Sequence, residues 1–193
     1  MDEETQKNHL KAYGIAFWTL ENDLTVDWLL NYRGGSFLIE NQTKIEKECI
    51  VRGVSYEIIT NAYKYQLQLE LANPESNTDI IKLEKAPKVA VYSPEGNLPW
   101  DDAVTMVLTY SEIPYDIIYD EEILSDMLPM YDWIHLHHED FTGQYGKFYA
   151  SFKNAPWYIE QKRNFEADAN RLGYSKVSSQ KLDVALKIKE FIT

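Results

Sequence analysis

The sequence from residue 88 to residue 136 contains three short apolar runs, KVAVYS (88–93), YDIIY (115–119) and YDWIHL (131–136). Each run has the length and the β-branched and aromatic content of a strand. Helical patterns separate the runs, and Asp101 is predicted as the N-cap of the first of these helices. Strands that alternate with helices pair in parallel, with the helices on the faces of the sheet. We therefore expect an α/β fold, a three-layer sandwich with a mostly parallel sheet.

The first half of the sequence predicts a helix, a strand and two further helices. Residues 5–20 carry apolar side chains at helical spacing, and residues 26–32 form a short strand-like run. Helical spacing returns over residues 43–71, where Gly53 is predicted to divide two helices. The predicted apolar stripe of this segment consists of Ile58, Ala62, Tyr65 and Leu69.

Residues 73–87, NPESNTDIIKLEKAP, hold the densest group of turn-forming and polar residues and are predicted to be the main linker. The sequence thus divides into an N-terminal α/β segment, residues 1–86, and a second α/β segment, residues 87–193, which could together form one continuous domain. The second segment ends in two predicted helices, with Gly173 as the stop of the first. The last helix, capped by Ser178 or Ser179, is expected to be buried on a wide face that has two apolar stripes. These stripes are Leu182/Ala185/Leu186 and Val184/Ile188/Phe191.

The composition restricts the class of protein. The chain has 193 residues, with 31 acidic and 19 basic side chains, and its formal net charge is −12. Its hydrophobic content of 45% is too high for a disordered chain. No apolar run approaches the roughly 20 residues of a membrane span, and the acid excess argues against a nucleic-acid partner. The single cysteine, Cys49, excludes an internal disulfide and is predicted to be a small buried core residue. We expect a soluble, acidic globular protein.

Residues 135–146, HLHHEDFTGQYG, are the most unusual stretch for chemistry. Three of the four histidines of the chain lie here beside two carboxylates, at the end of a predicted parallel strand. Ligand sites of open α/β sheets lie outside the carboxyl ends of the strands. The residues predicted as catalytic are His137, His138 and Glu139. Alternatively, His135, His137 and Glu139 could hold zinc or iron, or the stretch could be structural. The preferred prediction includes no cofactor.

The predicted ligand-binding residues come from two loops at the same edge of the sheet. One loop follows the strand at 88–93, and the other contains Gly143, which lets the backbone approach a ligand closely. In the structural alternative for the first loop, two prolines shape a turn, Trp100 packs and Asp101 caps a helix. The predicted ligand-binding residues are Glu95, Trp100, Asp101, Asp140, Thr142, Gly143, Gln144 and Tyr145.

A second-rank candidate site lies in the first half. Arg33 stands beside Gly34 and Gly35, and an arginine next to flexible glycines can bind a carboxylate or a phosphate. A simple turn with a surface arginine is the commoner case. Three residues that lead into the first helix are expected near this turn, namely Asp2, Gln6 and His9.

Four phrases carry a resemblance to a known family: NHLKAYGIAFW (8–18), VDWLLNYRGGSF (26–37), PWDDAVTMVLTY (99–110) and HLHHEDFTGQYGKFY (135–149). They resemble uncharacterised bacterial proteins labelled asparagine synthetase B. The second half, in its order of strands and helices, looks like the start of a class I glutamine amidotransferase-like domain. This resemblance implies a flavodoxin-like sheet.

The resemblance also implies an amidotransferase-like domain or hydrolase of unknown substrate, in an exported protein whose nucleophile elbow follows the last helix of this chain. A base such as His137 or His138 would then act on a cysteine of that elbow. No such elbow occurs in this sequence, so enzymatic activity is left open. The alternatives are a non-catalytic module that binds a small molecule or a protein partner through the same loop, and a metal-assisted hydrolase that uses residues 135–140.

Overall fold

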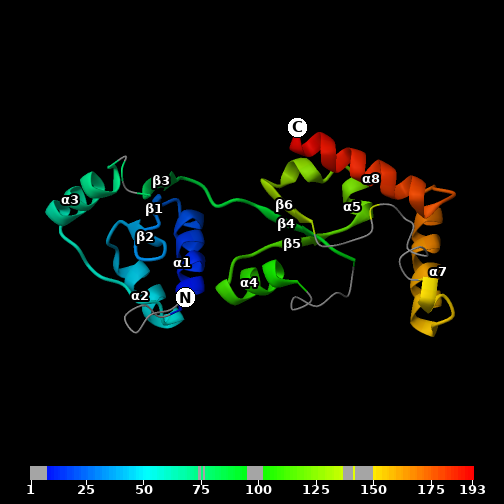
Figure 1. The fold of residues 1–193 in the computed structure, drawn as a ribbon, viewed down its shortest axis with the longest axis horizontal. Coiled ribbons are helices and arrows are strands. Elements are labelled where there is room, and N and C mark those ends of the chain that lie inside the picture. The colour runs from blue at the N-terminus through cyan, green and yellow to red at the C-terminus, as the bar shows by residue number, and fades with distance from the viewer. Residues whose placement is uncertain (1–7, 74, 76, 95–101, 137–140, 142–149) are drawn as a thin grey trace. The chain divides into compact units, whose positions relative to one another are not determined.

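The computed structural model describes residues 8–73, 75, 77–94, 102–136, 141 and 150–193 (Figure 1). The chain divides into two compact units. The first unit contains Met1–Pro87 and Pro99–Pro114, and the second contains Lys88–Leu98 and Tyr115–Thr193. The described residues form a mixed α/β structure with two small sheets, one of which is parallel. None of the helices in this described part has the length and apolar character needed to cross a membrane.

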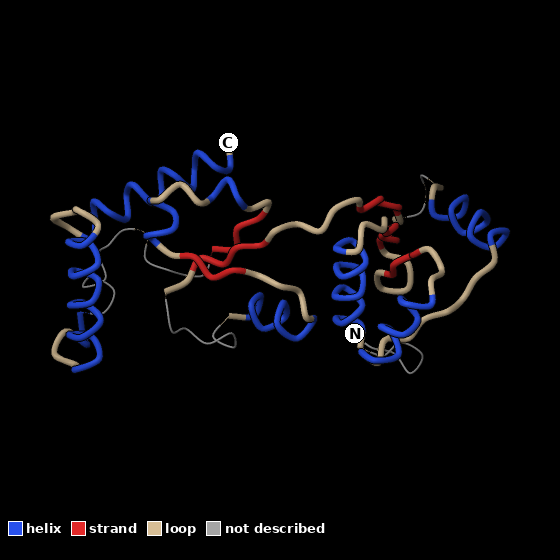
Figure 2. The backbone as a smooth tube through the Cα atoms, turned by 180° about the vertical axis from the view of Figure 1, so that it is seen from behind, coloured by secondary structure: helices blue, strands red, loops and turns tan. Residues whose placement is uncertain are grey.

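The first unit is built on an antiparallel sheet of order β2-β1-β3 (Figure 2). On the central strand, Trp28 lies opposite Phe37 on one side and Ile81 on the other. Apolar residues of α1 and α2 pack together around Ile15 and Cys49, and Cys49 is buried as predicted. The elements are α1 (His9–Glu21), β1 (Val26–Leu30), β2 (Ser36–Ile39), α2 (Thr43–Arg52), α3 (Asn61–Leu71), β3 (Asp79–Leu83) and α4 (Ala103–Ser111).

Two strands of this unit differ from the sequence prediction. β3 lies inside residues 73–87, the predicted linker, and β2 follows the two glycines that were expected only to end a strand. The linker prediction is therefore wrong for residues 79–83. Polar and turn-forming residues surround β3, and most of its side chains are exposed at an edge of the sheet, so its local strand signal is weak. Backbone pairing with β1 makes it a strand.

Two helices are confirmed within residues 43–71, and Gly53 ends the first of them, but residues 54–60 between the helices are not helical. The φ angle of Gly53 is 68°, which is the left-handed conformation that ends α2. The predicted apolar stripe is wrong, because Tyr65 and Leu69 are 65% and 59% exposed. The buried face of α3 instead carries Leu67 and Leu71, which pack with Leu29 of β1. The other members of the predicted stripe, Ile58 and Ala62, are exposed as well.

Helices α1 and α4 approach each other closely in the first unit. A Cβ atom on Gly14 would lie 1.8 Å from the backbone oxygen of Ser111, so only glycine fits at this point of α1. Beside the contact, Lys11 pairs with Glu112 at 3.1 Å. α4 lies in the predicted second segment, yet it packs in the first unit. Its N-cap is Asp102, whose carboxylate accepts hydrogen bonds from the backbone of the first turn, and Asp101 lies outside the described residues.

The second unit is built on a parallel sheet of order β5-β4-β6. Every residue of the central strand β4 is buried, as the apolar run KVAVYS predicts. The three predicted strands of this region are thus confirmed. The elements are β4 (Val89–Tyr92), β5 (Asp116–Ile118), α5 (Asp120–Leu124), the 3-10 helix η2 (Leu128–Met130), β6 (Trp133–Leu136), the 3-10 helix η3 (Ala150–Phe152), α7 (Pro156–Arg171) and α8 (Val177–Ile192).

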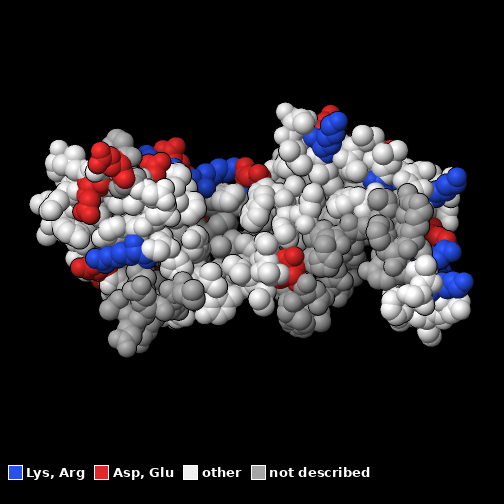
Figure 3. All heavy atoms as spheres, viewed as in Figure 1, with Lys and Arg blue, Asp and Glu red and all other residues white. Residues whose placement is uncertain are grey.

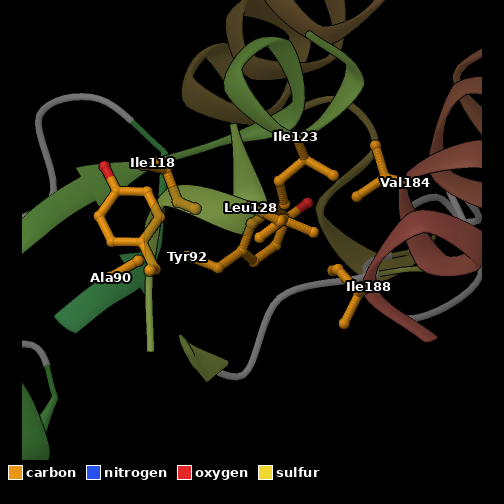
Figure 4. Close-up of a cluster of buried hydrophobic side chains, with 8 residues drawn as sticks. Ala90, Tyr92, Ile118, Ile123, Leu128, Val184 and Ile188 are labelled. Carbon is orange, nitrogen blue, oxygen red and sulfur yellow. The ribbon is translucent and has the colours of Figure 1, made fainter. Parts of the chain in front are cut away.

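One face of this parallel sheet is covered by α5 and α8 (Figure 4). Ala90, Tyr92 and Ile118 of the strands meet Ile123 of α5 and Val184 of α8 in one apolar cluster. Because Ile118, Ile123 and Val184 are almost fully buried, each of these side chains contributes roughly 1.5–3 kcal/mol to folding. This cluster fixes α8 against the strands.

The last helix is buried on one apolar stripe rather than two. Val184 and Ile188 are buried and Phe191 is partly buried, whereas Leu182 and Leu186 are 58% and 53% exposed. The expected wide face is therefore wrong for the stripe Leu182/Ala185/Leu186. α8 also starts at Val177, and its N-cap is Lys176, two to three residues before the predicted caps at 178 or 179. The stop at Gly173 is confirmed by its φ angle of 87°.

Candidate functional site

All the residues that the sequence predicts as catalytic or ligand-binding lie outside the described residues. They are His137, His138, Glu139, Glu95, Trp100, Asp101, Asp140, Thr142, Gly143, Gln144 and Tyr145. What the structure shows is the pair of strands that precedes them. β4 and β6 are adjacent and parallel, and their last residues, Tyr92 and Leu136, lie side by side. The two sequence segments that carry the predicted residues thus follow the carboxyl ends of neighbouring strands.

A buried polar cluster lies at this carboxyl edge of the sheet, behind β4 and β5. We call it the Lys181 cluster, and it consists of Tyr92, Tyr119, Asp120, Gln180 and Lys181. Tyr92 is the last residue of β4, Tyr119 and Asp120 follow β5 directly, and the other two come from the first turns of α8. Asp120, Gln180 and Lys181 are each only 2–3% exposed, which is rare for such side chains.

The ammonium group of Lys181 is fully engaged in this cluster. Its Nζ lies 2.8 Å from the hydroxyl oxygen of Tyr92 and 2.9 Å from that of Tyr119. It also lies 2.9 and 3.0 Å from the two carboxylate oxygens of Asp120. A lysine has three N–H donors, and these three partners use them all. The charge is therefore paired and hydrogen-bonded, the condition under which a buried lysine is tolerated.

Asp120 is held from three sides. Its Oδ1 accepts the hydroxyl proton of Tyr92 at 2.5 Å, and its Oδ2 accepts from the side-chain amide of Gln180 at 2.7 Å, in addition to Lys181. The amide oxygen of Gln180 is buried and has no hydrogen-bond partner among the described residues. The carboxylate thus ties the ends of β4 and β5 to α8, and one acceptor beside it is left unused.

Aromatic rings surround the same ammonium group. Its Nζ lies 4.2 Å from the ring centre of Tyr119, 5.4 Å from that of Tyr92 and 6.0 Å from that of Phe165, all within cation–π range. Tyr92 in turn stacks on Phe141, with ring centres 4.9 Å apart. Phe141 is the one described residue between Leu136 and Ala150. The stack therefore links the Lys181 cluster to the segment that carries the predicted histidines.

Sequence reasoning missed the Lys181 cluster, although a signal for it exists. Lys181 precedes Val184 by three residues and Ile188 by seven, so it lies on the buried stripe of α8. A charged residue on an apolar helical stripe is a sign of a buried partner. Naming Asp120 as that partner requires the pairing of β4 with β5, which no local pattern contains.

The amino edge of the same sheet is closed by other contacts. The backbone N–H of Lys88 donates to Asp132, and the hydroxyl group of Tyr131 donates to Asp116 at 3.1 Å. Burial, and then the hydrogen bond to Asp116, raises the pKa of Tyr131. These groups satisfy one another, so the carboxyl edge is the better candidate for ligand binding.

The described residues contain no group of three or more histidine, cysteine, aspartate or glutamate side chains that could hold a metal ion. His135 lies in β6 opposite Val91, and the other two proposed ligands, His137 and Glu139, lie outside the described residues. Cys49 lies in α2 of the first unit and is 6% exposed. Burial, followed by the charge of Glu48, raises the pKa of its thiol, so Cys49 has the properties of a core residue rather than a nucleophile.

A pocket of about 460 Å³ lies elsewhere in the second unit, between the ends of α5 and α7 and the middle of α8. Three of its polar lining residues, Tyr174, Asp183 and Lys187, are already paired. The hydroxyl group of Tyr174 donates to Asp183 at 2.8 Å, and Lys187 pairs with Asp126. The lining residues are Leu124, Ser125, Leu172, Tyr174, Asp183, Leu186 and Lys187.

Comparisons of the chain with protein-family models, with curated proteins and with solved structures found no match. The geometry of the chain itself is thus the basis for any assignment of function. On the face shown in Figure 3, the described lysine and arginine side chains occur in small separate groups, often beside acidic ones.

Proposed function

We propose that the second unit is an amidotransferase-like α/β domain that binds a small polar ligand between the carboxyl ends of β4 and β6. The observation that carries this proposal is the strand order β5-β4-β6, in which the chain moves from the central strand to one side and then crosses to the other. In open parallel sheets, ligands bind outside the carboxyl ends at the point where this direction reverses. The reversal here lies between β4 and β6.

The strand order also supports the flavodoxin-like architecture that the resemblance implies. Numbered by their order along the chain, the three strands have the arrangement 2-1-3, with which flavodoxin-like sheets begin. Helices α5 and α8 cover one face of the sheet. A three-layer sandwich additionally requires helices on the opposite face, and this layer is part of the proposal.

The two segments that follow β4 and β6 determine the chemical class of the ligand. Their carboxylates are Glu95, Asp101, Glu139 and Asp140. Carboxylates accept hydrogen bonds, so they favour a ligand that presents amino or amide N–H groups. This agrees with an amidotransferase-like domain, whose substrates carry a carboxamide. His137 or His138 is proposed to interact with the reacting group.

The Lys181 cluster supports the proposed site from behind. It fixes Tyr92 at the end of β4, and Tyr92 stacks on Phe141. A binding site requires such a rigid support, because small displacements of its groups cost affinity. The proposal includes binding and not acyl transfer, because the single cysteine of the chain, Cys49, is a buried residue of the other unit.

Isothermal titration of the chain with L-glutamine tests this proposal. We expect saturable binding that weakens by roughly 10- to 100-fold in Glu139→Gln, since a charge-assisted hydrogen bond contributes about 1.5–3 kcal/mol. The matched control is Glu166→Gln, an exposed carboxylate of α7 in the same unit, which is expected to leave the affinity unchanged. The absence of saturable binding, or equal affinity in Glu139→Gln, would falsify the proposed site.

A further inference from the structure

The turn between β1 and β2, the second-rank candidate of the sequence, is packed with its own side chains. Arg33 is exposed and already forms an ion pair. Three side chains lie in contact with the place where a Cβ atom of Gly35 would be, namely His9, Tyr13 and Trp28. The other two residues expected near this turn lie outside the described residues, and they are Asp2 and Gln6. This turn thus has the properties of a simple turn with a surface arginine.

The pocket of the second unit, which we call the α8 pocket, is by contrast open to a small molecule. Its volume is about 460 Å³, and ligand pockets of proteins typically have roughly 300–1,000 Å³. All its lining residues belong to the second unit. The α8 pocket is therefore formed by one compact part of the chain.

Helix α8 presents three different chemical groups to this pocket. Asp183, Leu186 and Lys187 all line it, because residues three and four positions apart lie on the same side of a helix. The apolar surface extends from Leu186 to Leu124 of α5 and to Leu172, which follows α7. The pocket thus combines an apolar surface with one carboxylate and one ammonium group.

The carboxylate of Asp183 has one oxygen atom left for a ligand. Its Oδ2 accepts a hydrogen bond from the hydroxyl group of Tyr174 at 2.8 Å. Burial, and then this hydrogen bond, raises the pKa of Tyr174, so the hydroxyl group stays protonated and holds the carboxylate in place. The other oxygen, Oδ1, accepts no hydrogen bond from the described residues. Asp183 can therefore accept a further N–H donor.

The ammonium group of Lys187 has donors left as well. Its one ion pair with a described residue is the pair with Asp126, whose side chain is 79% exposed. A lysine has three N–H donors, so two remain. The hydroxyl group of Ser125 at the edge of the pocket makes no hydrogen bond with the described residues either. Lys187 and Ser125 can therefore donate to an oxygen atom of a ligand.

We propose that the α8 pocket binds a free α-amino acid with an apolar side chain, of which L-leucine is an example. The ammonium group of the ligand donates to Asp183, its carboxylate accepts from Lys187 and Ser125, and its side chain packs on the three leucines. An amino acid carries all three groups on one carbon atom, whereas a simple amine or a simple carboxylate would leave one charge of the pocket unused. This site does not depend on the function proposed for the edge of β4 and β6.

Isothermal titration of the full chain with L-leucine tests the proposal. Two analogues each lack one charge, since 3-methylbutylamine has no carboxylate and 4-methylpentanoate has no ammonium group. We expect saturable binding of L-leucine, with each analogue at least about tenfold weaker, the value of a charge-assisted hydrogen bond. The absence of saturable L-leucine binding would overturn the proposal. An analogue that binds as tightly as L-leucine would overturn it too.

Variants of the lining residues locate the binding. Asp183→Asn and Lys187→Met each remove one charge and are expected to weaken binding by roughly 10- to 100-fold. Ser125→Trp changes an exposed residue and covers the pocket with a ring, so we expect it to abolish binding. The matched controls Glu190→Gln and Lys189→Met change exposed charges elsewhere on α8 and should leave the affinity for L-leucine unchanged. Equal affinity of the unaltered chain and the three pocket variants would overturn the proposal.

Glu139→Gln separates the α8 pocket from the site proposed at the edge of β4 and β6. This variant should bind L-leucine as the unaltered chain does, even though it is expected to bind L-glutamine more weakly. A loss of L-leucine binding in Glu139→Gln would place L-leucine at the other site and overturn the inference.

Discussion

Lys181 illustrates how much a single residue at the carboxyl edge of the parallel sheet contributes to the stability of the second unit. Its ammonium group is the only described cation that pairs with the buried carboxylate of Asp120. Replacement by methionine keeps the length of the side chain but leaves Asp120 buried without its counter-charge. Breaking a buried ion pair from one side costs about 3–5 kcal/mol. We therefore expect Lys181→Met to destabilise the second unit by this amount, as measured by hydrogen exchange of the β4 amides.

Lys187→Met on the same helix is the matched control, because its partner Asp126 has a side chain that is 79% exposed. Exposed pairs contribute about 0–1 kcal/mol. The double variant Lys181→Met/Asp120→Asn removes both charges and is expected to lose less stability than Lys181→Met alone. Equal losses of stability for the two single variants would show that the buried Lys181–Asp120 pair stabilises the unit no more than the exposed Lys187–Asp126 pair does.

Glu112 makes part of the stability of the first unit dependent on pH. The hydrogen bond from Lys11 lowers the pKa of Glu112, desolvation opposes this shift, and the charge of Arg52 adds to it. A lowered pKa in the folded state stabilises the fold above the ordinary carboxyl pKa, and this contribution is lost as the pH falls through the lowered value. The Glu112 side chain is 49% exposed, so solvent screening limits the effect to about 0.2–1 kcal/mol.

Urea unfolding at pH 7 and in acid measures this contribution. We expect Lys11→Met to lower the free energy of unfolding at pH 7 and to have a smaller effect at a pH below the lowered pKa. Lys44→Met, in which an exposed lysine of α2 near Asn22 is replaced, serves as the control and should show no such difference. A Lys11→Met effect of equal size at both pH values would contradict the pKa argument.

At the scale of elements, the contact between α1 and α4 depends on Gly14. Alanine is the better helix former by roughly 1 kcal/mol, but its Cβ would lie 1.8 Å from the backbone oxygen of Ser111. A backbone oxygen cannot turn away as a side chain can, so the helices must separate, at a cost of typically 1–3 kcal/mol. We expect Gly14→Ala to be destabilising overall and to weaken exchange protection in α4 in particular.

The reverse substitution on the same helix, Ala12→Gly, is the control for helix propensity. Ala12→Gly should lower the free energy of unfolding by at most about 1 kcal/mol. The ratio of amide exchange protection in α4 to that in α1 should stay the same. An increase in stability for Gly14→Ala would mean that α4 does not pack on this face of α1.

The elements that the sequence predicted correctly are those with strong local patterns. The run KVAVYS is apolar throughout, and β4 is buried at every position. β3 has no such pattern, because edge pairing with β1 and not local composition makes it a strand. Likewise, the exposed leucines at 182 and 186 have the same helical spacing as the buried stripe of α8. Periodicity finds a helix, but only the neighbouring elements decide which of two apolar stripes is buried.

The candidate sites also differ in how far the sequence predicts them. The apolar run at 131–136 predicted a strand just before the histidine segment, and β6 is this strand. The Lys181 cluster joins residues 60 or more positions apart, as in the pair Gln180 and Asp120. The aromatic contacts of Tyr13 with Trp28 and Phe37 depend on how α1 lies on the β1–β2 hairpin. Contacts of this kind come from tertiary packing, so the sequence indicates which residue types are present but not that they come into contact.

At the scale of the whole molecule, the two units share the chain in alternating pieces. The chain passes from the first unit to the second after Pro87, returns for Pro99–Pro114, and leaves again at Tyr115. Helix α4 lies between β4 and β5 in the sequence, but it belongs to the first unit, whereas these strands belong to the second. Its contacts in the first unit include Lys11 with Glu112 at 3.1 Å and the close approach of Gly14 to Ser111. The first unit consequently depends on both predicted segments of the sequence, 1–86 and 87–193.

This division predicts the behaviour of a cut chain. With a protease site introduced between Pro87 and Lys88, residues 1–87 and 88–193 should still elute together in gel filtration after cleavage, because α4 of the second fragment packs on α1 of the first. Gly14→Leu in the same cleaved chain is expected to separate the fragments, since a larger side chain cannot fit beside Ser111. Fragments that separate without this substitution would show that α4 is not held by the first unit. Fragments that stay together in both chains would show that contacts other than the α1–α4 packing join them.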